Sequence, residues 1–193
     1  MFDTLCQGPG CAIALGAMKR PEILAPAGSM ETLETACLYG ADAVYLGLRG
    51  GSNLRALARN FSLEELPHAV AYAHEKRVKV YLTLNTYPHD GQYVVLPDPI
   101  HAAWDTGIDA VIVSDIGVLS MVKRLAPSVP LHLSTQANAV SSHAVNAWAG
   151  LGVSRVILAR ELSCGEIETI RRNTRCELEV FIHGSVCISL SGR

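Results

Sequence analysis

The feature that most constrains the fold is a short unit that occurs three times along the chain, a glycine followed by a run of mainly apolar residues. The copies span Gly40–Gly47, Gly107–Ser114 and Gly152–Ala159. In each copy the glycine lies where a helix would end in a left-handed cap. The run that follows is rich in β-branched residues, as in a strand that is covered on both faces. The pattern therefore predicts a repeating unit of helix, glycine and buried strand.

Four further apolar runs raise the expected number of strands to about seven. They span Glu22–Ala25, Val78–Asn85, Pro130–Ser134 and Glu177–His183. Segments of helical length separate most of the strands, which indicates parallel strands joined by right-handed crossovers. We therefore predict an α/β fold, an incomplete (β/α)8 TIM-type barrel with about seven of its eight strands. The alternative is an open doubly wound sheet, but no Gly-x-Gly-x-x-Gly turn follows the first strand.

Composition is that of one ordinary α/β domain. The 193 residues are 49% hydrophobic with a formal net charge of −2, which argues against a nucleic-acid-coating or membrane-surface protein. Residues 1–17 are glycine-rich without a clear period, so we expect a disordered extension there, and the N-terminal part of a barrel domain over 18–193. We expect the eighth strand to lie beyond Arg193.

The cysteine pattern and the absence of targeting segments favour the cytoplasm. Six cysteines are scattered without a Cys-x-x-Cys pair, unlike a secreted disulfide scaffold. We find neither the charged front end of a secretory signal nor a stretch long enough to span a membrane. Cys37 falls on an apolar helical stripe, which favours core packing, and Cys164 falls in a first helical turn, which favours a surface cysteine.

Helix starts are marked by two capping boxes, Ser62–Glu65 and Ser163–Glu166. In such a box a serine and a glutamate satisfy two backbone N–H groups reciprocally. Their structural role is sufficient to explain these residues, so we assign them no chemistry.

Candidate site residues are the polar residues that end the predicted strands, because the carboxyl ends of barrel strands line the active site. Asn85, Gln136 and Arg160 are the hardest to explain as helix caps, since amide and guanidinium groups are costly beside apolar strands unless they meet a ligand or each other. Arg160 offers a planar fork that suits a carboxylate or a phosphate. Asn138 and His183 complete the set, whereas Ser29, Ser114 and Asp115 are equally well explained as caps.

A basic segment follows the second predicted strand. Arg55 and Arg59 would share a face if this segment is helical, and a basic loop at the mouth suits an anionic substrate. A plain solvated loop explains the same residues equally well, because two or three arginines are a small electrostatic footprint for nucleic acid.

The end of the chain carries the most specific signal. The pattern predicts a core strand over Leu178–Ile182. The polar turn that begins at His183 would orient Cys187 toward a ligand. These residues resemble the signature of the collagenase-like peptidase family (U32): Glu-x-Phe, two residues, Gly-Ser, one residue, Cys, then Ser-Gly-Arg. The likeness covers about residues 19–193, and further segments that carry it are Ala25–Ser29, Gly40–Tyr45, Leu133–Ala139 and Arg160–Ser163.

The resemblance implies a function that residue patterns alone do not give. Family members of the closest branch hydroxylate a transfer-RNA uridine without oxygen, with a 4Fe-4S iron–sulfur cluster and with prephenate as hydroxyl donor. Cys187 would be one of four thiolate ligands, the others lying outside this chain. Arg160, Asn85 and His183 would be catalytic, and Gln136, Asn138, Arg55 and Arg59 would bind substrate.

Three other hypotheses about the function remain open. A second branch of the family hydroxylates the ubiquinone ring in a complex with a partner protein, and Ser52–Arg55 resembles it. The family name implies a peptidase, for which His183 and Cys187 would form a dyad, yet no Gly-x-Ser-x-Gly or His-Glu-x-x-His motif accompanies them. The non-enzymatic reading is an inactive fragment. RNA is the partner that the resemblance favours.

Overall fold

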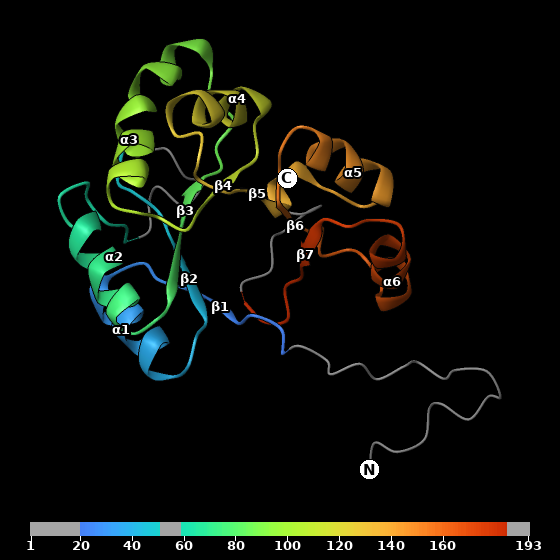
Figure 1. Ribbon diagram of the computed structural model, residues 1–193, viewed down its shortest axis with the longest axis horizontal. Coiled ribbons are helices and arrows are strands. Elements are labelled where there is room, and N and C mark those ends of the chain that lie inside the picture. The colour runs from blue at the N-terminus through green and yellow to red at the C-terminus, as the bar shows by residue number, and fades with distance from the viewer. Residues whose placement is uncertain (1–19, 51–58, 185–193) are drawn as a thin grey trace.

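The computed structural model describes residues 20–50 and 59–184, and in this part of the chain seven strands alternate with helices (Figure 1). The strands are β1 (Leu24–Pro26), β2 (Ala43–Leu46), β3 (Lys79–Leu84), β4 (Ala110–Val113), β5 (Leu131–Leu133), β6 (Arg155–Ile157) and β7 (Glu177–Glu179). The helices are α1 (Met30–Leu38), α2 (Leu66–Glu75), α3 (Pro97–Asp105), α4 (Ile116–Leu125), α5 (Ser142–Gly150) and α6 (Cys164–Arg172), with 3-10 turns η1 (Asp90–Val95) and η2 (Thr135–Ala137).

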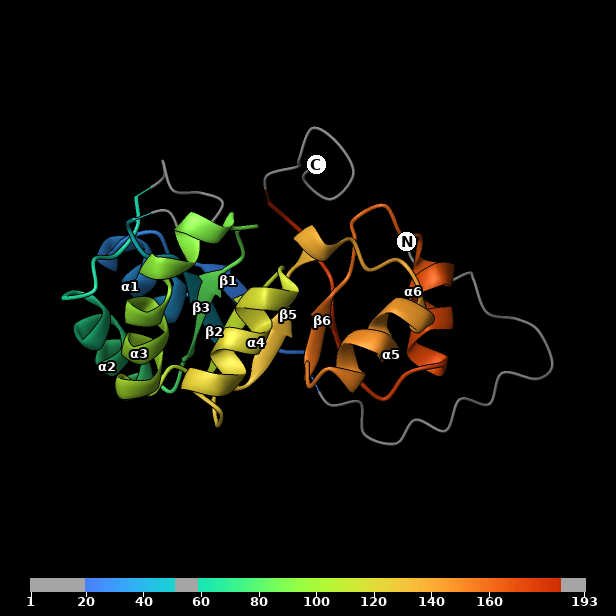
Figure 2. The same cartoon turned by 90° about the horizontal axis from the view of Figure 1, so that it is seen from above.

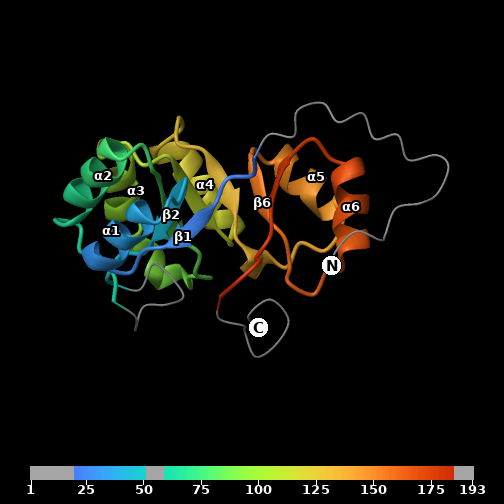
Figure 3. The ribbon, with the colours of Figure 1, turned by 90° about the horizontal axis from the view of Figure 1, so that it is seen from below.

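The seven strands form one parallel sheet in sequential order, β1 to β7. A doubly wound sheet reverses its strand order at a switch point, so the sequential order rules out that alternative for the described residues. The sheet is curled and the helices lie outside it, as the two turned views show (Figures 2 and 3).

The two faces of the sheet have different surroundings. Val111 and Val113 of β4 belong to the large core that packs against the helices. Ala110 and Ile112 of the same strand belong to a smaller cluster with Tyr81 of β3. Because side chains alternate along a strand, the first pair faces outward to the helices and the second faces the inside of the curl.

A contact between the two ends of the sheet shows how far the sheet curls. Glu22, just before β1, accepts a hydrogen bond of 2.5 Å from Arg155 of β6. Residues 133 positions apart in the sequence thus meet inside the curl. The predicted fold is confirmed: the described residues form an incomplete TIM-like barrel of parallel strands with helices outside.

The helix-end glycines behave as the repeat predicts. Gly40, Gly107 and Gly152 have φ values of 87°, 72° and 98°, the left-handed region in which glycine ends a helix without a Cβ clash. The Ser163 capping box opens α6 as predicted. Ser62 and Glu65 also exchange their two capping hydrogen bonds, but the regular helix begins only at Leu66.

The last predicted strand is longer than the strand that the structure shows. We expected a core strand over Leu178–Ile182, whereas β7 ends at Glu179 and Ile182 is 90% exposed. The cause is the partner strand: β6 ends at Ile157, which pairs with Glu179, so no ladder supports the following residues. The expected extension over residues 1–17 lies outside the described residues.

Candidate active site at the carboxyl ends of the strands

The predicted site residues that the structure describes mostly gather at one edge of the sheet. Asn85 follows β3 directly and is half-buried, and Gln136 lies in η2 after β5. Asn138 follows η2 with a left-handed φ of 52°, and Arg160 lies three residues after β6. Because all seven strands are parallel, these residues share the carboxyl edge, the mouth of the barrel. His183 lies beyond β7 and is exposed.

Part of the mouth is bridged by Tyr87. Its hydroxyl donates a 2.7 Å hydrogen bond to the backbone carbonyl of Gln136. Tyr87 follows β3 and Gln136 follows β5, so the bridge spans the end of β4, which lies between them in the sheet. Tyr87 was not among the residues predicted from the sequence.

Arg160 lies against an aromatic ring. Its guanidinium carbon is 5.3 Å from the ring centroid of Phe181, within cation–π range. Phe181 is 44% exposed, so guanidinium and ring form a partly open planar surface after β6 and β7. Such a surface suits stacking with a planar ligand.

Two of the polar strand ends are helix caps. Asp115 accepts hydrogen bonds of 2.8 and 2.9 Å from the backbone N–H groups of Gly117 and Val118 at the start of α4. Its carboxylate also accepts the Tyr93 hydroxyl at 2.6 Å, and this hydrogen bond raises the pKa of Tyr93 to about 12. Ser29 caps α1 in a box with Thr32. The structural explanation of these two residues is therefore sufficient.

Below the mouth lies one row of side chains that we call the floor row: Ser114, Ser134, Ile157 and Glu179. Inward-facing Ile112 pairs with His132, His132 with Arg155, and Arg155 with Glu177. Two residues further along each strand, the next inward-facing side chains are those of the floor row, in which Ile157 pairs with Glu179. The Ser134 N–H continues the ladder by donating to the carbonyl of Val113 at 2.8 Å.

Glu179 is the one acid in the floor row; it was predicted to lie in a strand and is the glutamate of the Glu-x-Phe signature, but no role in the site was predicted for it. Burial raises its pKa to about 7, and Arg155 at 3.6 Å offsets only part of this effect. The signal that could have identified it is the spacing of Glu177 and Glu179, which puts two acids on the inward face of a strand that is otherwise apolar.

Toward the amino ends of the strands, the interior holds a paired network around Arg155, whose side chain is only 13% exposed. Its guanidinium donates to Glu22 at 2.5 Å and to Glu177 at 2.7 Å. Tyr81 also donates to Glu22, at 2.7 Å. Burial would raise the pKa of Glu22, but hydrogen bonds from Arg155, Lys79 and Tyr81 lower it to about 2. This network was not predicted from the sequence.

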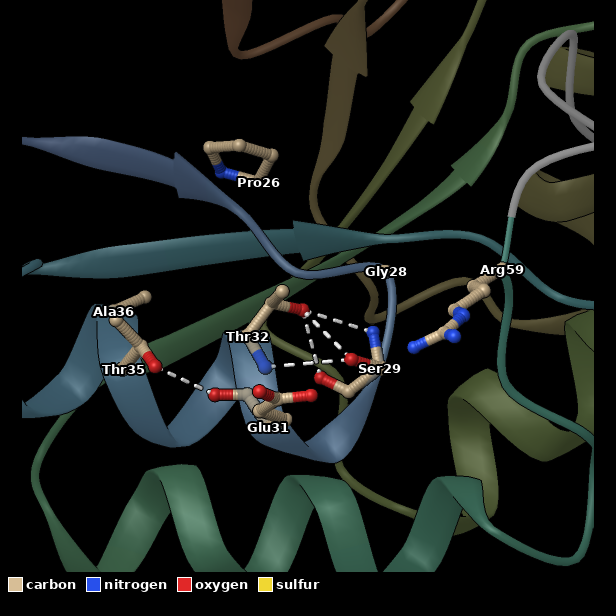
Figure 4. A pocket seen from close by; sticks show the side chains of 8 residues that line it. All are labelled: Pro26, Gly28, Ser29, Glu31, Thr32, Thr35, Ala36 and Arg59. Carbon is tan, nitrogen blue, oxygen red and sulfur yellow. Dashed lines mark hydrogen bonds between the residues drawn. The ribbon is translucent and has the colours of Figure 1, made fainter.

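A cavity of about 540 Å³ opens beside α1 rather than at the centre of the mouth (Figure 4). Its lining residues are Pro26, Gly28, Ser29, Glu31, Thr32, Thr35, Ala36 and Arg59. The polar side chains of Ser29 and Thr32 are already hydrogen-bonded to each other and to α1 backbone. Arg59 is exposed and lies outside any helix, as in the alternative of a solvated loop, and Arg55 lies outside the described residues.

The predicted metal ligand Cys187 also lies outside the described residues. Within residues 20–50 and 59–184, no group of three or more His, Cys, Asp or Glu side chains could hold a metal ion. Cys176 is buried at the amino end of β7, with its thiol 3.4 Å from the carbonyl of Ser154, so it lies at the opposite end of the barrel from the mouth. The iron–sulfur cluster stays a prediction.

The described cysteines agree with their predicted structural roles. Cys37 packs against the main core, and Cys164 is exposed at the start of α6. Cys37, Cys164 and Cys176 are all free thiols. None of the helices in the described part of the chain is long and apolar enough to cross a membrane.

Relatives of known name match nine-tenths of the chain. It is 41% identical over 175 residues to the tRNA hydroxylation protein P1 of Bacillus subtilis, covering 91% of this chain and 41% of that protein. It is 36% identical over 174 residues to the 23S rRNA 5-hydroxycytidine C2501 synthase of Escherichia coli, covering 90% of this chain and 26% of that protein. The collagenase of Porphyromonas gingivalis is 36% identical over 184 residues, covering 89% of this chain and 44% of that protein. The chain thus spans less than half the length of these relatives.

A solved structure has a similar fold. The U32 peptidase Mk0906 superposes with a TM-score of 0.69 at 19% identity, covering 83% of this chain and 68% of that one. The family model for peptidase family U32 matches residues 28–193. On these matches, together with the parallel half-barrel and its polar carboxyl edge, the chain belongs to peptidase family U32.

Proposed function

We propose that the protein takes part in hydroxylating a base of RNA, with a uridine of transfer RNA as the substrate. The observation that carries this proposal is the 41% identity, over nine-tenths of the chain, to a tRNA hydroxylation protein. A relative named as an rRNA 5-hydroxycytidine synthase supports the same reaction class. Both relatives are more than twice as long as this chain, so the activity is proposed for the protein together with whatever completes it.

The geometry of the mouth supports an RNA substrate. RNA-binding proteins recognise unpaired bases by stacking them on aromatic or guanidinium planes and by hydrogen-bonding their edges. Arg160 over Phe181 offers such a plane, and Asn85, Gln136 and Asn138 place amide groups at the same edge of the sheet. The guanidinium of Arg160 also suits the carboxylate of a small hydroxyl donor such as prephenate.

The proposal includes a 4Fe-4S cluster with Cys187 as one thiolate ligand. Such a cluster, when bound, supplies one-electron chemistry, while residues of the mouth position the base and the donor. A reducing compartment, the cytoplasm, suits both the cluster and the free thiols of Cys37, Cys164 and Cys176.

The test is a gene deletion followed by mass spectrometry of the nucleosides in total tRNA and rRNA. We expect a hydroxylated pyrimidine to disappear and to return on complementation with the wild type. Arg160→Ala should fail to restore it, whereas Arg175→Ala should restore it, because Arg175 is exposed at the amino end of β7, away from the mouth. Persistence of every hydroxylated nucleoside in the deletion strain would refute the proposal.

A peptidase is the second candidate, on the strength of the relative named collagenase. Cleavage of gelatin by the purified protein, lost in Cys187→Ser, would favour it. Failure of ubiquinone synthesis without oxygen, with RNA nucleosides unchanged, would instead favour the quinone reading and a partner protein.

A further inference from the structure

Four buried side-chain atoms in the described part of the chain make no hydrogen bond. They are Ser114 Oγ, His132 Nδ1, Asn138 Oδ1 and Glu179 Oε2. Buried polar atoms are paired in the large majority of cases, so each exception calls for an explanation such as a missing ligand or water. Three of the four belong to the mouth or its floor row, and only His132 lies one row deeper.

Glu179 is the strongest of these exceptions because a carboxyl group is costly to bury without a partner. Its Oε2 lies 3.6 Å from the guanidinium of Arg155, beyond hydrogen-bonding distance. Arg155 instead donates its hydrogen bonds to Glu22 and Glu177. The ionisable residues in the same interior network are Glu22, Lys79, Tyr81, His132, Arg155 and Glu177.

The end of β7 puts this carboxyl group at the floor of the mouth. Glu179 pairs with Ile157, and both are the last residues of their strands. Ser114, buried to 3% exposure and without a partner for its hydroxyl, lies in the same floor row. Asn138 lies above this row, after β5. The unpaired groups therefore belong to the carboxyl end, where barrel enzymes bind their substrates.

We propose that Glu179 binds the hydrogen-bonding edge of the target base, with its O–H donating to a ring carbonyl and its C=O accepting from the adjacent ring N–H. A carboxylic acid and the lactam edge of uracil are complementary in this way, as each offers one donor beside one acceptor. Ser114 and Asn138 supply a further hydroxyl and a further acceptor at the same end. This inference rests on the proposed function and specifies which residue reads the base.

The protonation state of Glu179 fits this role. Burial raises its pKa to about 7, so at neutral pH the acid form is well populated. Once ionised, the group has no proton to donate and its charge repels a carbonyl oxygen. Base binding should therefore weaken as the pH rises through 7, and glutamine, a neutral group with one donor and one acceptor, should replace the acid form.

The experiment measures binding of uridine to the full chain by calorimetry at pH 6 and pH 8. The wild type should lose about tenfold in affinity between these values, following the fraction of protonated Glu179. Glu179→Gln should bind equally at both pH values, with an affinity within about twofold of the wild type at pH 6, and Glu179→Ala should bind about tenfold more weakly at pH 6.

The matched control is Glu177→Gln, two residues upstream on the same face of β7. Glu177 also contacts Arg155, but its side chain is 65% exposed and its Oε2 accepts hydrogen bonds of 2.7 and 2.9 Å from the guanidinium. This variant should bind uridine as the wild type does at both pH values. A second control is 3-methyluridine, which lacks the ring N–H. It should bind weakly, and with the same affinity to the wild type and to the Glu179 variants.

Two results would overturn the inference. One is a pH dependence that survives in Glu179→Gln, and the other is wild-type affinity in a folded Glu179→Ala, as expected if a water molecule serves Oε2. Failure of uridine to bind the wild type at pH 6 would also overturn it. None of these results alters the nucleoside profile of the deletion strain, so the proposed function is judged separately.

Discussion

Replacing Arg155 by methionine should destabilise the fold by about 3 kcal/mol at neutral pH. Methionine keeps the apolar stem but removes the guanidinium that donates to Glu22 and Glu177. The difference between the ordinary pKa of Glu22, 4.5, and its value of about 2 in the fold corresponds to about 3 kcal/mol of stabilisation. Lys79 and Tyr81 share in this effect, but the variant also leaves Glu179 buried without its counter-charge.

The sign of the pH dependence follows from the lowered pKa of Glu22. A carboxyl group with a lowered pKa in the folded state contributes its full stabilisation above about pH 4.5 and loses it as the pH falls toward 2. The deficit of Arg155→Met relative to the wild type should therefore shrink on acidification from about pH 4.5 toward 2. It should also grow above about pH 7, because loss of the guanidinium raises the pKa of Glu179 and the folded state then resists ionising that group.

Urea unfolding followed by circular dichroism at several pH values would measure this deficit. The control is Arg172→Met, which breaks an exposed ion pair with Glu168 in α6 and should cost no more than about 0.5 kcal/mol. If Arg155→Met costs no more than this control, or if its deficit does not change with pH, the network around Arg155 does not stabilise the fold as we argue.

Three further predictions concern single contacts. Ser163→Ala removes the α6 capping box and should lower the free energy of unfolding by about 1 kcal/mol, measurable by urea titration. Burial lowers the pKa of His132 to about 4, so the folded state resists protonating a group that the unfolded chain protonates near 6.5. Its contribution to stability should be lost as the pH falls from about 6.5 to 4, and His132→Gln should remove that part of the slope. Gly117→Ala places a Cβ 2.3 Å from the Tyr93 hydroxyl and should break the hydrogen bond between that hydroxyl and Asp115. A double variant that also carries Tyr93→Phe should therefore unfold at nearly the same urea concentration as Gly117→Ala alone.

The barrel could be predicted because its signals are local. Each of Gly40, Gly107 and Gly152 adopts the left-handed conformation that ends a helix, and each precedes a buried strand. Parallel strands buried on both faces are uniformly apolar, so a short run such as Ala110–Val113 is recognised without any knowledge of its neighbours. The carboxyl-edge placement of Asn85 and Arg160 follows from the same reasoning, since it needs only the strand ends.

The interior network could not be predicted because it depends on which residues meet across the curl. Arg155 and Glu22 are far apart in the sequence, and Arg155 lies in a repeat copy that reads simply as a buried strand. The end of β7 was missed for a related reason. Its apolar composition continues to Ile182, but the length of a strand depends on its ladder partner, and β6 stops at Ile157.

Glu177 and Glu179 illustrate how one strand serves both stability and the proposed chemistry. Both face inward from β7 and both approach Arg155, but Glu177 receives hydrogen bonds of 2.7 and 2.9 Å while Glu179 stays at 3.6 Å. The exposed acid pairs with the guanidinium at little desolvation cost. Glu179, one row closer to the mouth, is less exposed, and burial leaves it with an unpaired oxygen and a raised pKa. Arg155→Met should then raise the pKa of Glu179 further, so carboxyl NMR of this variant would show whether the guanidinium sets the protonation of the floor as well as the stability of the fold.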